Sequence, residues 1–517
     1  MFTLNESSLQ QGFDTIMHHG YSDFFPEPPE WRAVQSGWSE LRVTLSKIDL
    51  QAYEPYRPVY AFAPKSKINL RPVTLLHPVD LILYTTLVSQ LSDNIEERRI
   101  AEEENRIFSF RSESIAGELY SSTPSHAEFE EEKRVRAHRQ GAGYMGFADI
   151  TDFYSRLYQH KVRGALDACT VDSPQLQAYP QVIERLLRNL THDGLSYGIP
   201  IGPAASRPLA EAALIDIDDA LLELGIDFIR YIDDFVIFAS SREKIEWALR
   251  SLGGLLDKRQ GLSLHAAKTK VLRCTSFLQN TARNDSAEDS VEARFAQLIE
   301  DHFYDEAGGR LLDELTDEEK EALDAVDLEA VLTEALDEEE IDYKKVAFIL
   351  DRLSSLDRAD LVDIVLQHLP RLYPVAHAVH AFFRNIEPID PSTRKRCAKE
   401  LLAPILASGD AQAPEFYAIW ILDLFGLSSN WNQAIDLGNI FRTTSSQAVR
   451  RYAALALSAS GNRSQALSFK EAFQSSEPLT RLALLQGSRK LGADERKYWL
   501  KRSNLDWFEN FVLKKQP

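Results

Sequence analysis

The pattern of apolar and polar positions divides the chain into two parts. Residues 1–284 mix short, aromatic-rich apolar runs with helical periods and Gly/Pro punctuation. The runs 228–232 and 235–238 predict two β-strands, and the periodicity of residues 80–104 predicts a helix. After residue 345 the strand-like runs end, and short spacers separate helix-length apolar periods. The predicted fold class is therefore α+β, with a mixed first part and an all-α last part.

The helical periods of residues 346–517 favour stacked helical pairs of the HEAT type, in which each pair buries an apolar face against the next. Their repeat is too degenerate to assign a period, so an ordinary helical bundle is the alternative. Residues 285–345 differ from both neighbours because carboxylates alternate with leucines at helical spacing. We predict three regions: a mixed domain at 1–284, an acidic helical connector at 285–345 and an α-helical repeat-like domain at 346–517.

The composition is typical of a folded, soluble protein: 44% of the 517 residues are hydrophobic and 26% are charged. No run of about 20 apolar residues is present to cross a membrane, and the N-terminus lacks the basic and apolar regions of a signal peptide. The few cysteines exclude a disulfide framework and a Cys-built zinc site, and they fit a reducing cytoplasm. They are Cys169, Cys274 and Cys397.

The net charge of −20 argues at first against a nucleic-acid enzyme, because binding phosphates requires Lys and Arg. Most of that charge lies in one place, since residues 285–345 contain 23 acidic and 5 basic residues. The rest of the chain is nearly neutral and remains free to meet nucleotides. The acidic segment shows no calcium-loop spacing, so we interpret it as solvated acidic helices.

The strongest chemical signal is Tyr231-Ile232-Asp233-Asp234, between the two predicted strands. Adjacent carboxylates between buried strands are electrostatically costly and require water, a cation or a turn. A hairpin with both acids at its tip exposes them, and a metal ion compensates their charge. An ordinary Asp-Asp turn is the alternative.

A second aspartate, Asp149, follows the apolar lead-in 146–148 at the end of a predicted strand. The chain then turns helical from Ser155 to Val162. N-capping by Asp149 or Asp152 is one interpretation, and we assign capping to Asp152 and metal ligation to Asp149. Together with the two hairpin acids, Asp149 supplies hard oxygen ligands suited to two Mg²⁺ ions beside substrate phosphates.

A third signal is the loop 197–206, which contains two glycines and two prolines and runs into a predicted helix at 208–214. Small residues let a flat base or sugar approach the backbone closely. Taken alone, the loop is equally typical of a plain loop-to-helix junction.

In this order and spacing the three signals resemble the palm of reverse transcriptases. The similar segments are Pro64–Lys65, Leu70–Val73 and His77–Asp80 in the fingers, Asp149–Tyr154 as motif A, Gly198–Ser206 as motif B, Tyr231–Asp234 as motif C and Gly261–Lys270 as motif D. The resemblance covers roughly residues 50–280. It implies that region 1–284 forms the fingers and palm of a DNA polymerase.

The resemblance also implies dNTP substrates and two Mg²⁺ ions, which Mn²⁺ can replace. By this resemblance, a hydroxyl would attack the α-phosphate in line, one ion would activate that hydroxyl, and both ions would stabilise the developing charge. The implied site residues are Asp149, Asp233 and Asp234 as catalytic metal ligands, Lys65 and Arg71 as the triphosphate clamp, Tyr154 as the steric gate against a ribose 2′-OH, Lys268 as the cation beside the leaving pyrophosphate, and Gly198 and Pro200 as parts of the dNTP site.

Two departures narrow this resemblance. Ile201 stands where many templated enzymes carry Gln in motif B, and no compact thumb follows motif D. A fingers–palm core followed by a helical domain is similar to the abortive-infection (Abi) reverse transcriptases of bacteria, of the AbiK and AbiA type. The length is nearest to that of the member from P2-like prophages.

Similarity to the Abi enzymes implies antiphage defence, homo-oligomers and DNA synthesis without a template. It also implies that the single-stranded DNA product begins on a protein hydroxyl, with a tyrosine as the primer. Tyr21, Tyr53, Tyr56 and Tyr60 lie near the fingers, and none is preferred, because tyrosines more often serve packing.

Two alternatives remain open. A conventional templated reverse transcriptase, as in retrons or group II introns, predicts a basic thumb and an RNA partner. A non-catalytic scaffold, in which the helical repeats bind partners, predicts a decayed palm. The intact set of Asp149, Asp233 and Asp234 argues against decay.

Overall fold

The computed structural model describes residues 2–65, 69–112, 117–121, 123–191, 195–285, 328–339, 341–354, 359–386 and 390–515. They group into two compact units. Unit 1 comprises Met1–Tyr21, Glu40–Pro55 and Val79–Glu306, and unit 2 comprises Ser22–Ser39, Tyr56–Pro78 and Ala307–Pro517. Two N-terminal segments therefore belong to the same unit as the C-terminal helices. The predicted boundaries at 284 and 345 stay a prediction, and most of the predicted connector lies outside the described residues.

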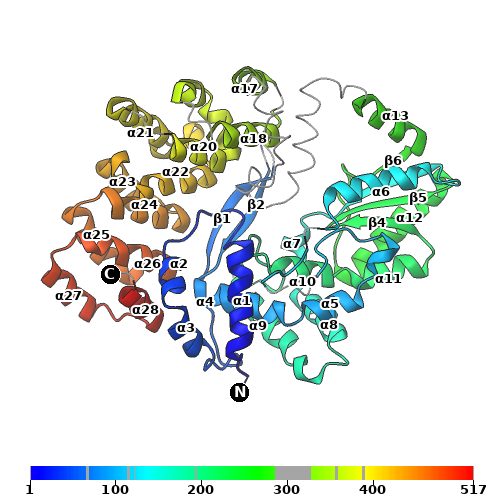
Figure 1. Cartoon of the computed structure of the whole chain (residues 1–517), viewed down its shortest axis with the longest axis horizontal. Helices are drawn as coiled ribbons and strands as arrows, with labels where there is room; N and C mark the ends of the chain where they lie inside the picture. Colours follow the sequence, from blue (N-terminus) through cyan, green and yellow to red (C-terminus); the bar gives the residue numbers. More distant parts are fainter. Residues whose placement is uncertain are drawn as a thin grey trace. The chain divides into compact units, whose positions relative to one another are not determined.

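Unit 1 is built around a four-stranded antiparallel sheet with the strand order β4-β5-β3-β6 (Figure 1). The strands are β3 (Tyr144–Asp149), β4 (Asp227–Tyr231), β5 (Asp234–Ala239) and β6 (Lys270–Arg273). Strands β4 and β5 confirm the two strands predicted on either side of the paired aspartates, and β3 confirms that Asp149 ends a strand.

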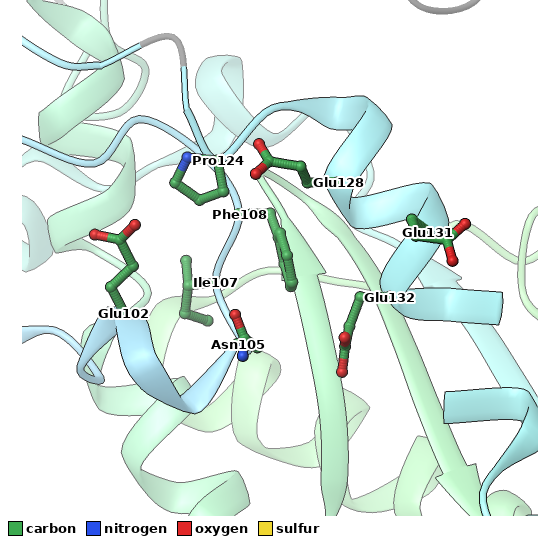
Figure 2. Close-up of a pocket in the computed structure, with 8 residues that line it drawn as sticks. All are labelled: Glu102, Asn105, Ile107, Phe108, Pro124, Glu128, Glu131 and Glu132. Atoms are coloured by element: carbon green, nitrogen blue, oxygen red, sulfur yellow. The ribbon is translucent and has the colours of Figure 1, made fainter. Parts of the chain in front are cut away.

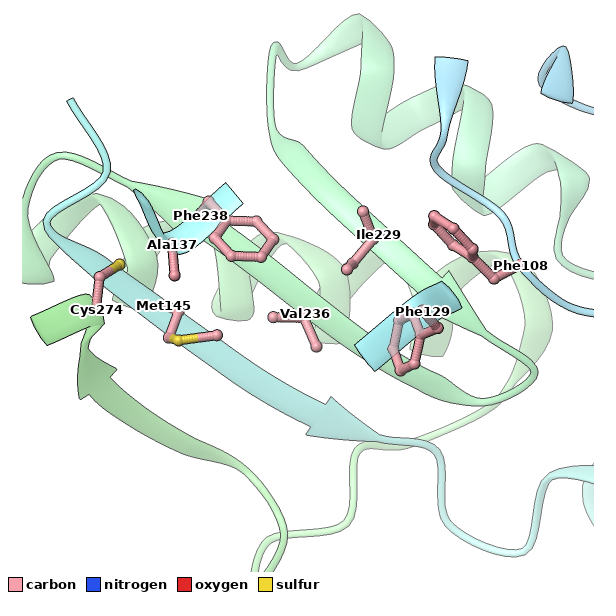
Figure 3. Close-up of a cluster of buried hydrophobic side chains, with 8 residues drawn as sticks. All are labelled: Phe108, Phe129, Ala137, Met145, Ile229, Val236, Phe238 and Cys274. Atoms are coloured by element: carbon pink, nitrogen blue, oxygen red, sulfur yellow. The ribbon is translucent and has the colours of Figure 1, made fainter. Parts of the chain in front are cut away.

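Helices cover both faces of this sheet. On one face, α6 (His126–His138) and the start of α13 (Cys274–Asp285) enclose an apolar cluster (Figure 3). On the other face, α12 (Arg242–Leu255) packs so closely that a Cβ at Gly146 would lie 2.6 Å from Ile245 Cγ2. The sheet is thus packed between helices on both faces, which hold it in place within unit 1. The cluster of Figure 3 consists of Phe108, Phe129, Ala137, Met145, Ile229, Val236, Phe238 and Cys274.

The helix predicted at 80–104 is divided in the structure. It forms α4 (Pro78–Ser89), α5 (Ser92–Arg98) and a 3-10 turn at Glu102–Glu104. The break after α5 has a tertiary cause, because the Arg99 guanidinium donates to the carbonyls of Ser109 and Phe110 at 2.7 and 2.9 Å. The other helices of this part of the chain are α1 (Glu6–His19), α3 (Trp38–Leu45), α7 (Phe153–Arg156), α8 (Gln159–Cys169), α9 (Tyr179–Leu190), α10 (Ser206–Ala212) and α11 (Ile215–Glu223).

In its described residues, unit 2 consists of helices and the hairpin of β1 (Val59–Pro64) and β2 (Leu70–Leu75). In its described C-terminal part, alternate helices pack each against the next, from α18 through α20, α22 and α24 to α26 (Figure 1). The helices are α2 (Trp31–Ser36), α17 (Leu328–Asp337), α18 (Tyr343–Ser354), α19 (Val362–Gln367), α20 (Ala376–Asn385), α21 (Pro391–Leu406), α22 (Glu415–Leu427), α23 (Ala434–Thr443), α24 (Gln447–Ser460), α25 (Arg463–Ala472), α26 (Pro478–Gly487), α27 (Ala493–Arg502) and α28 (Trp507–Lys515).

This architecture confirms a mixed α/β core followed by a helical C-terminal region. The HEAT-like description of the helices stays a prediction. The apolar periods did not indicate α27, none of whose residues is buried, because an exposed helix carries no apolar stripe.

The two N-terminal segments of unit 2 pack against its helices. Strand β1 lies against α22 and α24, and the Phe62 N–H donates to Glu415 Oε2 at 3.1 Å. Arg451 of α24 is fully buried, and its Nη2 lies 2.8 Å from both carboxylate oxygens of Glu30. A buried ion pair therefore joins residues 421 positions apart in the sequence.

Helix α20 carries a pH-sensitive side chain. Burial, with the nearby His380, lowers the pKa of His377 from 6.5 to about 4. His380 faces Asp423 at 3.0 Å, and Trp420 packs beside both histidines. Because the folded state favours neutral His377, its contribution to stability is present above pH 6.5 and is lost as the pH falls towards 4.

We therefore expect the melting temperature of the wild type to fall more steeply between pH 6.5 and 4 than that of His377→Phe. Thermal melts of both proteins across this range measure the difference, with His368→Phe as a control on another helix-rich segment of unit 2. Parallel curves for wild type and His377→Phe would contradict the expectation.

Within the described residues, none of the helices is long and apolar enough to cross a membrane.

Candidate active site

The antiparallel pairing of β3 and β5 brings two of the predicted aspartates together. In that register Asp149 is directly opposite Asp234. Residues that are directly opposite in an antiparallel pair point to the same face of the sheet, with Cβ atoms about 4.5–5.5 Å apart. Asp149 is 5% exposed and Asp234 is partly exposed, so both carboxylates lie at the edge of the protein interior.

Asp233 belongs to the tight turn that joins β4 to β5. Only Ile232 and Asp233 separate the two strands, and the Asp233 carbonyl accepts a hydrogen bond from the Ile150 N–H at 3.2 Å. Ile232 has φ = +54°, the left-handed region. A β-branched residue there is strained by about 1–3 kcal/mol and persists only where its surroundings hold it.

Lys268, which belongs to the predicted motif D, lies beside Asp149. The His265 N–H donates to the Asp149 carbonyl at 2.7 Å, and the Lys268 N–H donates back to the His265 carbonyl at 3.0 Å. This turn directs the Lys268 ammonium onto Asp149 Oδ2, to which it donates a hydrogen bond. Burial opposes the Lys268 charge, yet its pKa is raised because Asp149, Asp234 and Asp233 stabilise that charge.

The electrostatics of the three aspartates show an excess of negative charge. Burial, then the charges of Asp234 and Asp149, raises the pKa of Asp233 to about 7. Burial, then the charge of Asp149, raises the pKa of Asp234 to about 6, and Lys268 opposes this rise. Lys268, with a smaller contribution from Lys133 at Asp234, therefore compensates the three carboxylates only in part.

This donor set fits a hard divalent cation, because carboxylate oxygens are the ligands that Mg²⁺ and Mn²⁺ prefer and the local charge is undercompensated. In the described part of the chain, however, no group of three or more His, Cys, Asp or Glu side chains is arranged as a finished metal cage. Lys268 contacts Asp149 at the place where a cation would reduce the repulsion.

The chain after Asp149 departs from the predicted continuous helix. Helix α7 is a single turn, and α8 begins only at Gln159. Asp152 occupies the N-cap position of α7 with φ = +48°, but its side chain makes no cap hydrogen bond, so the predicted capping role is wrong. The break arises because Leu157 and Tyr158 pair with the Gly-Pro loop, where the Gly198 N–H donates to the Leu157 carbonyl at 2.7 Å.

Motif B is held tightly against motif A. Gly198 has φ = +86°, and a Cβ there would lie 3.3 Å from the Ser155 carbonyl oxygen, so glycine is required both by conformation and by close approach. The Ile199 N–H donates to the carbonyl of Tyr154 at 3.0 Å. Gly198 and Pro200 are buried, and Tyr154 is partly exposed.

Gln159 was not recognised from the sequence. It is 1% exposed, and its Nε2 donates to the carbonyls of Leu195 and Gly198 at 3.0 and 3.2 Å and to Thr191 Oγ1 at 3.1 Å. One amide thereby fixes the loop that carries motif B. Its role could not be predicted from the sequence, because polar side chains are common at the first position of a helix.

A second group not recognised from the sequence is a cluster of buried polar and ionic side chains beside the turn. Its members, which are all less than 5% exposed, are Ser109, Glu211, Asp218 and Arg230. The sequence did contain a signal. Arg230 interrupts an apolar strand and Glu211 an apolar helix, and charges at such positions must be paired when they are buried.

The predicted triphosphate clamp lies on the β1–β2 hairpin of unit 2. Lys65 is exposed, and its N–H donates to the Asn69 carbonyl at 2.8 Å. The Arg71 guanidinium lies 5.7 Å from the centre of the Phe24 ring, and its buried Nε has no hydrogen-bond partner among the described residues. Their dNTP-binding roles, like those of Tyr154, Gly198, Pro200 and Lys268, stay predictions.

Unit 1 also contains a hollow of about 230 Å³ that includes none of the predicted site residues (Figure 2). Four glutamates line it, together with apolar Ile107 and Phe108. Glu132 is already paired with Arg136 and Arg139 at 2.7 and 3.0 Å. We therefore place the candidate site at the aspartates and not at this hollow.

Comparison with known proteins identifies the domain around the aspartates. Residues 63–293 match the family model described as reverse transcriptase (RNA-dependent DNA polymerase). A comparison with curated proteins finds no match.

Several solved structures show weak similarity, including two of telomerases. Apo telomerase from Candida tropicalis truncated from its C-terminal domain is 13% identical, with 47% of this chain and 55% of that chain covered and a TM-score of 0.33. This chain thus spans about half the length of that structure. Telomerase from Candida albicans in complex with the TWJ fragment of telomeric RNA is 10% identical, with 76% and 70% covered and a TM-score of 0.33. Such TM-scores are too low to indicate a shared overall arrangement.

The family match covers all three aspartates, the Gly-Pro loop and Lys268, and the strand pairing places Asp149 opposite Asp234. Residues 63–293, which include the aspartates, are therefore similar to the reverse-transcriptase (RNA-dependent DNA polymerase) domain family.

Proposed function

We propose that the chain is a reverse-transcriptase-type DNA polymerase of antiphage abortive infection, which makes DNA from dNTPs without a template and starts each strand on a hydroxyl of the protein. The observation that carries the catalytic part is the register that sets Asp149 opposite Asp234, with Asp233 in the adjoining turn. The part specific to abortive infection is supported by the helical C-terminal region that follows the palm where a thumb is expected.

Asp149, Asp233 and Asp234 would hold two divalent ions, Mg²⁺ or Mn²⁺. Bound there, the ions would activate the attacking hydroxyl and stabilise charge on the α-phosphate. The chain's own contribution is to hold the carboxylates at one edge of the sheet and to present Lys268 beside them. On leaving Asp149, the Lys268 ammonium can neutralise the departing pyrophosphate.

Substrate recognition would come from the loops around the aspartates. Tyr154, the second residue of α7, would act as the steric gate, because a bulky ring there would clash with a ribose 2′-OH. Lys65 and Arg71 would bind the triphosphate. The priming tyrosine is not assigned, although Tyr53 donates to the buried Asp80 at 2.6 Å and Tyr56 stacks on His77 at 3.8 Å.

The decisive experiment incubates the purified full chain with Mg²⁺ and labelled dNTPs after RNase treatment, without added nucleic acid. We expect labelled DNA that migrates with the protein on a denaturing gel and is released as free single strands by protease. The same reaction with ribonucleotides alone is the control, because the steric gate is expected to exclude them.

A conventional templated reverse transcriptase gives a different result. Its product would appear only after a primer–template is added and would follow the template sequence. That outcome would contradict template-free, protein-primed synthesis. No incorporation under either condition would contradict the proposed polymerase itself.

A further inference from the structure

A network of buried charges lies beneath the hairpin Tyr231–Asp234 in unit 1. Its centre is Arg230, which has no exposed surface. Arg230 Nε and Nη2 donate to the two carboxylate oxygens of Asp218 at 3.0 and 2.6 Å, and Nη1 lies 3.0 Å from Glu211 Oε2. Arg99 donates to the same Glu211 oxygen at 2.8 Å. Two guanidinium groups and two carboxylates thus balance each other away from water.

The network is hydrogen-bonded to the hairpin at the backbone N–H and the backbone carbonyl of Ile232. Arg230 Nη1 donates to the Ile232 carbonyl at 2.9 Å, and the Ile232 N–H donates to Ser109 Oγ at 2.9 Å. Ser109 Oγ in turn donates its only proton to Glu211 Oε1 at 2.6 Å. The carboxylate therefore orients the hydroxyl as an acceptor for Ile232.

These two hydrogen bonds act on the strained residue of the turn. Ile232 has φ = +54°, which is strongly disfavoured for a β-branched side chain. If the N–H and the carbonyl were released, the turn could relax towards a conformation with negative φ. Because Asp233 and Asp234 follow directly, such a relaxation would move both carboxylates relative to Asp149.

We propose that Ser109, Glu211 and Arg230 are positioning residues, which hold the strained turn so that Asp233 and Asp234 converge with Asp149 on the metal ions. The inference rests on the proposed function, which gives these aspartates their role. Glu211 lies on α10, the helix that the Gly-Pro loop enters, so the network also joins motif B to motif C.

The first test is Ser109→Ala, which removes one hydroxyl and leaves Arg230, Asp218, Glu211 and Arg99 paired. We expect kcat for dNTP incorporation to fall about tenfold with little change in KM, and the melting temperature to fall modestly because Ile232 and Glu211 lose a buried hydrogen-bond partner. The matched control is Ser89→Ala on α4, where a buried hydroxyl donates to the Thr85 carbonyl at 2.8 Å. If the Ser109 hydroxyl were merely structural, both variants would keep the kcat of the wild type and would change only the melting temperature.

The second test is rescue at the turn itself. Glycine adopts positive φ without strain, so Ile232→Gly needs no external restraint. In the Ile232→Gly background, Ser109→Ala should therefore lower kcat much less than in the wild type. An equal loss in both backgrounds would overturn the claim that the network restrains this residue.

A third measurement does not depend on polymerase activity. Mn²⁺ binding, followed by the electron paramagnetic resonance of free Mn²⁺, should weaken about tenfold in Ser109→Ala and remain unchanged in Ser89→Ala. If both variants match the wild type in Mn²⁺ affinity and in kcat, the positioning proposal is overturned, whereas the polymerase proposal stands.

The reverse outcome is also distinguishable. If the wild type binds Mn²⁺ in a way that Asp234→Asn abolishes and Ser109→Ala weakens, but incorporates no nucleotide, the proposed function fails while the positioning role is supported. Wild-type protein that binds no Mn²⁺ at these aspartates would overturn both.

Discussion

Asp234→Asn is expected to lower DNA synthesis by about 10³-fold, because a metal ligand lost from the two-ion site removes several kcal/mol of transition-state stabilisation. Asp234 is directly opposite Asp149 in the β3–β5 register, so the strand pairing alone brings these two predicted metal ligands together. The measurement is steady-state incorporation of labelled dNTPs by the full chain.

The fold of this variant should be retained. Replacing the carboxylate with an amide removes repulsion from Asp149 and Asp233, so the melting temperature should not fall. The control is Asp167→Asn on α8, an exposed carboxylate 3.4 Å from Arg163, which should leave activity unchanged. Synthesis by Asp234→Asn at a rate comparable to that of the control would contradict the catalytic assignment. Phage plating on cells that carry the variant extends the same comparison to defence.

Glu30→Gln is expected to destabilise unit 2 by about 3–5 kcal/mol, because it leaves the buried Arg451 guanidinium without its counter-charge. Glu30 is 3% exposed, and Arg451 Nη2 lies 2.8 Å from both of its oxygens. Chemical unfolding followed by circular dichroism, which reports mainly on helices, measures the loss.

The matched control is Glu477→Gln, which breaks an ion pair with Arg57 at 2.9 Å in the same unit. The Arg57 side chain is 67% exposed, so this pair should contribute no more than about 1 kcal/mol. Replacing both Glu30 and Arg451 with methionine should cost less than Glu30→Gln alone. Equal effects of the two single Glu→Gln variants would show that burial does not govern the strength of the Glu30–Arg451 pair.

Local patterns predicted the parts of the site that depend on short stretches of chain. Apolar, aromatic-rich runs on either side of Asp233 and Asp234 predicted β4 and β5, and the apolar lead-in predicted that Asp149 ends a strand. These predictions succeeded because strand periodicity and turn composition are properties of neighbouring residues.

The remaining features depend on distant partners and were therefore not predictable from local patterns. The helix around residue 99 ends because Arg99 reaches the 109–110 carbonyls, and the helix after Asp149 breaks because the Gly-Pro loop binds its backbone. Similarly, Arg230 gave a signal as a charge in an apolar strand, but its partner Asp218 could not be identified without the fold.

The pairing of Glu30 with Arg451 has a consequence for the biogenesis of the protein. During synthesis the segments 22–39 and 56–78 leave the ribosome before the helices of unit 2 that cover them are translated. Until those helices are made, apolar residues such as Trp31, which is buried in the folded protein, stay exposed to solvent. Chaperone binding would protect them from aggregation at this stage. The same interleaving limits evolution by exchange of whole modules: a recombination that replaced only the C-terminal helices would leave Glu30 buried against an unmatched partner.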